Sequence, residues 1–296
     1  MKYSIVFRVF FLGFIAFVCL SFVVLTLKRN SEEKNTGFPN EKERAIEKID
    51  NTKKLLPYLT SPDLETRKAG IIQLGRVGKP HDIDLLMKIL HEEPLNDAPH
   101  IETVGRTIQE EIVLAITTID GAKAKKQLMK IVKEYIETGA KFKDHLGRNI
   151  FGVITAKVIY EGLESLRNFP DKEVDSFVCD IEASNKIDDW SIKEAAWSTH
   201  LAIQMKRQGI QNIEDQTRFL VSQLNGSGVG PDAWARPGIK TPQAIRNGAV
   251  QSTLANLGKD ALPNLQDFSQ TLTDKRKVRA IKEVIESIKL REGIKN

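Results

Sequence analysis

Residue types that build β-sheets and disulfide frameworks are scarce in this chain. Of its 296 residues only 7% are aromatic, and no Asn-Gly or Asp-Gly pair stands between two alternating apolar runs, so β-hairpins have little support. There are two cysteines, and because Cys19 lies inside a long apolar run, Cys179 has no partner for a disulfide in the rest of the chain. These absences predict an all-α protein.

Catalytic and cofactor motifs are also missing. The sequence has no nucleophile elbow, no Cys/His pair at a recognised spacing and no paired-carboxylate motif. The glycine-rich "GSGVG" lacks the strand before it and the Lys-Ser/Thr after it that a phosphate-binding loop needs. We therefore expect no enzyme activity, no cofactor and no metal, and assign no catalytic, cofactor-binding or metal-binding residue.

One long run of residues carries no charge at all, residues 9–27, and it follows a short tail, residues 1–8. A helix over these nineteen residues would reach roughly 28 Å, close to the thickness of the hydrocarbon core of a bilayer. The run exceeds the roughly 7–15 apolar residues of a signal peptide, and no A-x-A-like cleavage site follows it. We expect an uncleaved signal anchor that crosses the membrane once.

The orientation of this anchor depends on which positive charges count. Lys and Arg alone, counted on both sides, would put the main body of the protein in the cytoplasm. However, long domains translocate largely regardless of charge, whereas the tail carries the amino terminus, Lys2 and Arg8. We therefore expect the tail inside and an extracytoplasmic body, which in a bacterium would be periplasmic.

After the anchor the chain changes character twice. Residues 28–50 hold twelve charged side chains in twenty-three and are interpreted as a charged linker and the start of a helix. Short amphipathic segments follow, of which the first clear one is expected to begin at Ser61 and Pro62 and to end at Gly78. Such helices can bury their apolar faces only by packing on one another, and Gly75 predicts close approach of two backbones.

The segments repeat along the sequence. Sliding the chain by 42 positions places residues 85–90 over residues 127–132 and Leu74 over Ile116. A weaker echo at an offset of 180 places Leu254 over Leu74. Repetition at such a period is typical of stacked helix pairs.

The repeated residues resemble the HEAT repeats, particularly their short bacterial type, which resembles the repeats of phycobilisome lyases. The pattern is a helix, an "S-P-D" turn, and a second helix with charged and then small residues, as in "ETRKAGIIQLGRVG". The match is close over residues 51–91, moderate over 108–133 and 244–290, and only helical in character over 150–224. The resemblance implies an α-solenoid of about five HEAT-like helix pairs over residues 51–290, with a C-terminal tail at 291–296.

Two inserts interrupt the repeats. The first, residues 91–104, offers metal-ligand side chains such as His91 and His100, but at no fixed spacing, so a solvated loop is the better interpretation. The second, residues 225–243, contains Trp234, Arg236 and Lys240, which are predicted to bind a partner because Trp and Arg are favoured at binding hot spots. The alternative is that Trp234 tucks between two units and fixes the loop.

Charge argues against nucleic acid as the partner. The net charge of +5 falls to +3 for residue 9 onward, once Lys2 and Arg8 are left out. The basic run 275–296 is interpreted as the polar outer face of the last unit, with contact to anionic lipid or nucleic acid as the alternative.

Two functions compete on these grounds. The resemblance implies a membrane-anchored scaffold that binds a protein partner through its solenoid surface. Because some HEAT-like proteins resemble DNA glycosylases and others act as lyases on bilin chromophores, a HEAT-like enzyme is the alternative. A glycosylase would need a cytoplasmic body and a basic, aromatic groove, which the charge hardly supplies.

Overall fold

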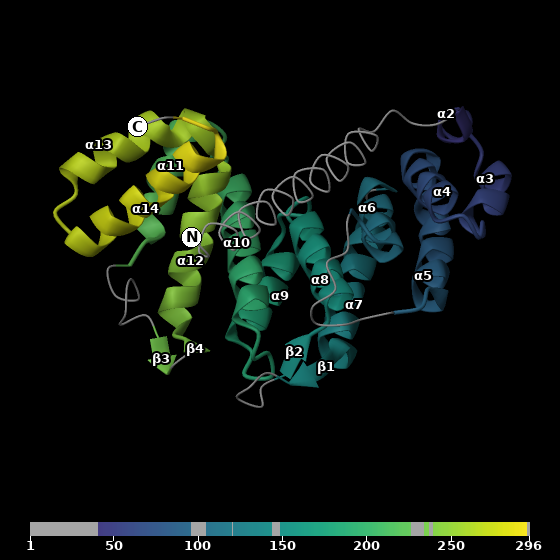
Figure 1. Cartoon of the computed structure of the whole chain (residues 1–296), viewed down its shortest axis with the longest axis horizontal. Helices are drawn as coiled ribbons and strands as arrows, with labels where there is room; N and C mark the ends of the chain where they lie inside the picture. The colour runs from purple at the N-terminus through teal and green to yellow at the C-terminus, as the bar shows by residue number, and fades with distance from the viewer. Residues whose placement is uncertain are drawn as a thin grey trace, which may run out of the picture. The chain divides into compact units, whose positions relative to one another are not determined.

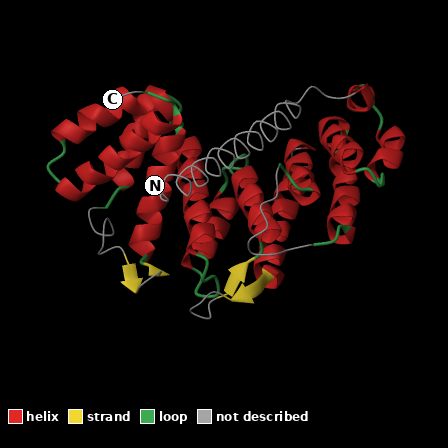
Figure 2. Cartoon of the chain, viewed as in Figure 1, coloured by secondary structure: helices red, strands yellow, loops and turns green. Residues whose placement is uncertain are grey.

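The computed structural model describes residues 41–95, 105–119, 121–143, 149–225, 234–236 and 239–294 (Figures 1 and 2). These residues are mostly helical, which confirms the all-α class. The helices are α2 Glu41–Glu47, α3 Thr52–Leu59, α4 Leu64–Val77, α5 Ile83–Glu92, α6 Ile108–Ile119, α7 Ala122–Gly139, α8 Val153–Leu166, α9 Lys172–Ala183, α10 Trp190–Arg207, α11 Ile213–Gln223, α12 Pro242–Asn256, α13 Leu262–Thr271 and α14 Lys275–Arg291.

The chain divides into two units, residues 1–48 and residues 49–296. The described residues of the first unit are those of α2 and Lys48, and the expected anchor at residues 9–27 lies outside them. Among the helices of the described ranges, none is both long enough and apolar enough to cross a membrane. The anchor and its orientation therefore stay predictions.

Within residues 49–296 the helices pair in chain order. Each odd-numbered helix from α3 to α13 packs on the even-numbered helix that follows it, and the even-numbered helices α4 to α14 contact one another in succession (Figure 1). The described residues thus contain six such pairs, where the repeats predicted about five. Residues 150–224, which resemble the repeats only in being helical, hold α8 to α11.

Close packing between α4 and α6 explains why the first of these pairs was easy to recognise. A Cβ added at Gly75 would lie 2.8 Å from the Cα atom of Ala115, so the two backbones do approach closely, as predicted. The offset of 42 residues is confirmed, because it places α4 on α6 and α5 within α7. Gly78 ends α4 as expected, but the helix begins at Leu64 with Asp63 as its N-cap.

Two short antiparallel strand pairs, which the sequence did not predict, stand beside the helices. β1 (Ala140–Lys143) pairs with β2 (Asn149–Phe151), and β3 (Trp234–Arg236) pairs with β4 (Ile239–Lys240). The insert at 225–243 therefore has a β-ribbon in the part that is described. Each strand pair directly precedes the even-numbered helix of a helix pair, α8 or α12, and both appear at the lower edge of Figure 2.

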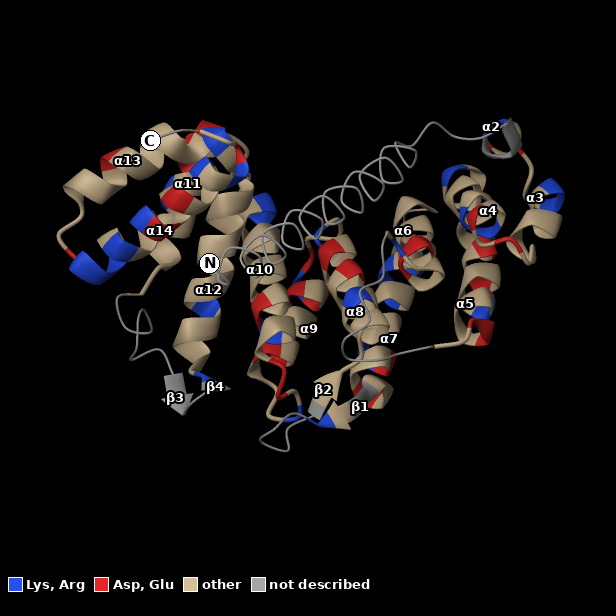
Figure 3. Cartoon of the chain, viewed as in Figure 1, with Lys and Arg blue, Asp and Glu red and all other residues tan. Residues whose placement is uncertain are grey.

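Charged side chains of both signs are interspersed along the helices (Figure 3). α14 buries one face against α12 and α13, including Ala280, Ile281 and Ile288. Its outer face carries Arg279 and Glu283, which pair at 3.0 Å. This arrangement suits the polar outer face expected of a last unit.

Candidate functional site

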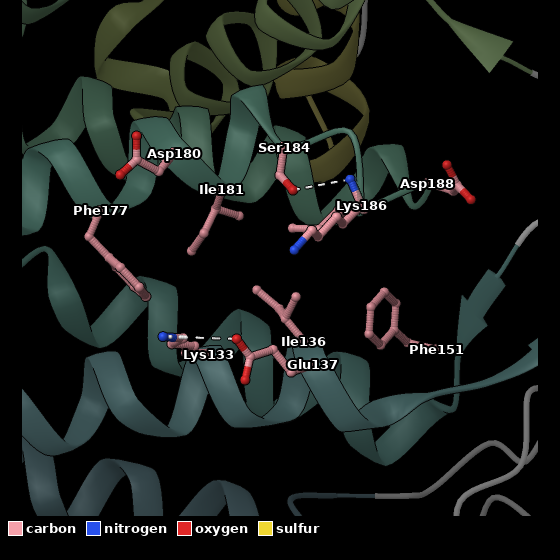
Figure 4. A pocket seen from close by; sticks show the side chains of 11 residues that line it. Lys133, Ile136, Glu137, Phe151, Phe177, Asp180, Ile181, Ser184, Lys186 and Asp188 are labelled. Atoms are coloured by element: carbon pink, nitrogen blue, oxygen red, sulfur yellow. Dashed lines mark hydrogen bonds and ion pairs between the residues drawn. The ribbon is translucent and has the colours of Figure 1, made fainter.

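A groove lies between α7 and α9 and is closed at one end by β2 (Figure 4). Its volume is about 620 Å³, within the range of roughly 300–1,000 Å³ that is common for ligand pockets. The lining residues are Lys133, Ile136, Glu137, Phe151, Phe177, Asp180, Ile181, Ser184, Lys186, Ile187 and Asp188. We call this cavity the α7–α9 groove.

The start of α9 is fixed by polar contacts that hold it beside α7. Asp171 is the N-cap of α9 and accepts hydrogen bonds from the backbone N–H groups of Glu173 and Val174, both at 3.0 Å. Lys125 of α7 pairs with Asp171 at 2.9 Å and with Glu173 at 2.6 Å. The hydrogen bond that Lys125 donates lowers the pKa of Asp171, and the hydrogen bonds to Glu173 and Asp171 raise the pKa of Lys125. The two helices that line the groove are therefore tied together at their other ends.

The floor of the α7–α9 groove is apolar. Phe177 points from α9 into the groove, and Phe151 of β2 and Ile136 of α7 face the same space (Figure 4). Ile181 and Ile187 are almost fully buried beside them. Two aromatic rings in an open cavity present a surface that large apolar groups can occupy.

Charges of both signs surround that floor. Lys133 pairs with Glu137 along α7 at 3.9 Å, and Lys186, Asp180 and Asp188 stand on the opposite side. The lining therefore carries two cations against three anions. Such a rim selects for no single charge and suits a ligand with polar groups around an apolar centre.

The predicted partner-binding residues lie elsewhere, around β3 and β4. The backbones of Trp234 and Arg236 form β3, and their side chains lie outside the described part of the structure. The Lys240 ammonium lies 3.6 Å from the ring centre of Trp190 and 3.2 Å from a carboxylate oxygen of Glu194. Lys240 thus joins the insert to α10, and its role in partner binding stays a prediction.

The first insert can be followed only at its beginning. His91 lies 3.3 Å from Glu134 of α7 at an exposed position, and Glu93 pairs with Arg67 of α4 at 3.1 Å. Residues 96–104, which include His100, lie outside the described residues. The interpretation of the whole insert as a solvated loop stays a prediction.

A cysteine, a histidine and an aspartate meet where α9 packs on α10. The Cys179 sulfur lies 3.3 Å from Nδ1 of His200, and Oδ1 of Asp175 lies 2.7 Å from the same nitrogen. A nucleophilic triad would need the thiol and the carboxylate on different ring nitrogens. Burial and the nearby carboxylates also raise the pKa of the Cys179 thiol, which disfavours the reactive thiolate. The arrangement is therefore unsuited to nucleophilic catalysis.

A second polar contact continues this cluster towards α12. Arg246 binds Glu182 through two hydrogen bonds of 3.0 Å each, and its guanidinium lies 4.4 Å from the ring centre of Trp197. The Trp197 ring in turn lies 4.5 Å from the ring of His200. The hydrogen bonds to Glu182 raise the pKa of Arg246.

No family model, curated protein or solved structure matches the chain. The likeness to HEAT repeats therefore stays a prediction from the residues quoted above.

Sequence reasoning missed both the groove and the Asp-Cys-His cluster. The groove residues come from α7, β2 and α9, and no local motif joins Ile136 to Phe177. A weak signal existed for the cluster: Asp175 and Cys179 are four residues apart, which places them on one face of a helix. His200 joins them only through the packing of α10 on α9.

Proposed function

We propose that this protein is a HEAT-like α-solenoid that serves as a membrane-anchored scaffold and binds a segment of a partner protein in the α7–α9 groove. Residues 9–27 would hold it in the membrane with an extracytoplasmic body. The resemblance of the sequence to HEAT repeats and the chain-order stacking of the six described helix pairs support the solenoid.

The observation that carries the binding proposal is the groove itself. It is open, has Phe177 and Phe151 at opposite sides with apolar residues between them, and bears charges of both signs. Protein interfaces combine a desolvated apolar centre with such a polar rim, and aromatic anchors supply much of their binding energy. The proposed occupant is a peptide segment with one or two large apolar side chains flanked by charged residues.

A peptide selection tests this proposal with the full chain in detergent micelles. A displayed library of random peptides would be selected for binding, and the affinity of each selected peptide measured by fluorescence polarisation. Phe177→Ser should weaken binding at least tenfold, because it removes an aromatic anchor from the groove. Selected peptides should carry apolar residues between charged ones.

Another groove supplies the matched control. Leu56 is 45% exposed beside a smaller cavity that α3 and α5 line, so Leu56→Ser makes a similar change outside the α7–α9 groove. Peptides that bind Phe177→Ser as tightly as the unchanged protein, or that lose binding equally with Leu56→Ser, would contradict the proposed site.

The orientation needs a separate experiment. Alkaline phosphatase fused after Asn296 is active only when it is exported, so activity is expected if the body lies outside the cytoplasm. An inactive fusion that is present in normal amount would place the body in the cytoplasm and restore the DNA-glycosylase-like alternative.

A further inference from the structure

The Asp-Cys-His cluster at the α9–α10 contact contains three kinds of metal ligand. Asp175, Cys179 and His200 each offer one ligand atom, and these atoms all lie within 4.8 Å of one another. A thiolate, an imidazole and a carboxylate together suit a divalent ion of borderline softness, above all zinc. We propose that these three residues bind one zinc ion, with a fourth coordination position open to water or another small ligand.

One distance between the ligand atoms already fits this assignment, and a second requires a small shift. Bonds of the length that zinc makes to S, N and O place neighbouring ligand atoms roughly 3.3–3.7 Å apart in a tetrahedron. The 3.3 Å between Cys179 Sγ and His200 Nδ1 lies in that range. The 2.7 Å between His200 Nδ1 and Asp175 Oδ1 is a hydrogen bond, which has to open by at least about 0.6 Å to admit the ion.

The residues around the cluster orient the ligands. Oδ2 of Asp175 accepts hydrogen bonds from Gln204 at 2.7 Å and from Arg207 at 3.0 Å, which leaves Oδ1 turned towards His200. The Trp197 ring lies against the imidazole, with 4.5 Å between the ring centres. Partners that hold a carboxylate and an imidazole in this way are a regular feature of metal sites.

The local charge also favours a cation. Asp175, Asp180 and Glu182 lie close enough to the Cys179 sulfur for their charges to act on it. Their negative charge attracts a divalent ion. Arg207 and Arg246 oppose the ion, but each already binds one of the acids, at Asp175 and Glu182.

The side chains are sheltered but reachable. Asp175 is 13% exposed and His200 is 18% exposed, so an ion could enter from solvent while its ligands stay packed between two helices. Binding of the ion would cross-link α9 to α10, and none of the three ligands lines the α7–α9 groove. The metal proposal is therefore independent of the proposed peptide binding.

Cobalt(II) is the probe of choice, because thiolate coordination gives a charge-transfer band and tetrahedral geometry gives intense visible bands. The full chain would carry Cys19→Ser, which leaves Cys179 as the one thiol. We expect saturation at one cobalt per chain, a thiolate charge-transfer band, and displacement by one equivalent of zinc. Cys179→Ser should abolish the band, and His200→Asn should weaken binding at least tenfold.

The exposed contact between His91 and Glu134 provides the control. His91→Asn also removes a histidine that faces a carboxylate, and it should leave the cobalt spectrum unchanged. A spectrum without the charge-transfer band, a band that survives Cys179→Ser, or equal loss with His91→Asn would overturn the proposal.

A second measurement does not depend on the folding of a variant. Zinc should raise the Tm of the Cys19→Ser protein in a concentration-dependent manner, since an ion that binds only the folded state stabilises it, and a chelator should reverse the rise. An unchanged Tm at saturating zinc would count against the site.

Discussion

Two helix contacts in the stack differ in the side chains that stand at them. Where α4 packs on α6, backbones approach at Gly75 and Ala115, and apolar side chains such as Leu74 and Ile116 fill the space around them. Where α10 packs on α9 and α12, polar and charged groups stand at the contact, including His200, Glu182 and Arg246.

The difference teaches that one stacking arrangement can be held by unlike forces. Small residues give the first contact its stability through close packing, which is non-directional and tolerates exchange of similar side chains. The second contact uses directional hydrogen bonds, such as that between Ser198 and Thr253 at 2.8 Å, which require each partner to be present. The polar contact is also the one that gathers candidate metal ligands.

Removal of one ionic partner at the polar contact should have the largest effect on stability. Arg246→Ala leaves Glu182, which is 4% exposed, without its two hydrogen bonds. An uncompensated buried charge typically costs roughly 3–5 kcal/mol, so the free energy of unfolding should fall by about 3 kcal/mol. Urea denaturation followed by circular dichroism measures this loss.

Arg218 supplies a control for the removal of an arginine that has two acidic partners. It pairs with Glu214 and Asp215 on the exposed surface of α11, and Arg218→Ala should cost less than about 0.5 kcal/mol. Equal losses for the two variants would mean that the polar contact depends on its apolar residues after all.

The apolar contact should fail for a steric reason. Gly75→Ala gains about 1 kcal/mol of helix propensity, but its new methyl group meets the backbone of Ala115, and such overpacking costs roughly 1–3 kcal/mol. We expect a net destabilisation of about 1 kcal/mol in the same denaturation experiment.

The polar contact offers a glycine for comparison. A Cβ at Gly248 would meet the carboxylate of Glu194, the far end of a flexible side chain, instead of backbone. Gly248→Ala should therefore be neutral or slightly stabilising. The comparison between the two contacts would break down if Gly248→Ala cost as much as Gly75→Ala.

The difference between the apolar and the polar contact also decides how much of the structure could be predicted from the sequence. The offset of 42 residues located α4, α6 and α7 because apolar and small residues recur at the positions that pack. The start of α4 was misplaced because Ser61 and Asp63 can both cap a helix; in the structure the Asp63 carboxylate accepts from Thr66 N–H.

Neither candidate site was predictable in this way. Polar contacts such as Asp175 with His200 join residues twenty-five positions apart and leave no periodic trace. The β1–β2 pair, which brings Phe151 to the groove, was missed because strands of three or four residues lie below what alternation can reveal.

A smaller effect is expected at the start of α9. Asp171→Ala removes the N-cap and should cost about 1 kcal/mol, whereas Asp171→Asn keeps a capping side chain and loses only its charge towards Lys125. Lys125 lowers the pKa of Asp171. The contribution of the Asp171 charge to the stability of the protein is therefore present above the ordinary aspartate pKa and is lost as pH falls through the lowered value.

Thermal unfolding at neutral and acid pH would separate these contributions. The Asn variant should lie close to the unchanged protein at neutral pH, because exposed ion pairs contribute little. If the Asn variant were as unstable as the Ala variant, the ion pair with Lys125 would position α9, and not the hydrogen bonds of the N-cap.

The smallest effect should come from a carboxylate near the apolar contact. Burial raises the pKa of Glu111 on α6, an effect that Arg106 and Lys68 oppose without cancelling. Because the folded protein then holds the proton more tightly than the unfolded chain, ionisation of Glu111 disfavours folding. This penalty is absent below the unfolded pKa, grows as pH rises from there, and is fully present above the raised value. Glu111→Gln should therefore stabilise the protein by up to about 0.5 kcal/mol at neutral pH and have no effect in acid. A loss of stability at neutral pH would mean that attraction to Arg106 and Lys68 outweighs burial. The α4–α6 contact would then also depend on charge, and it would differ from the contacts of α10 with α9 and α12 only in degree.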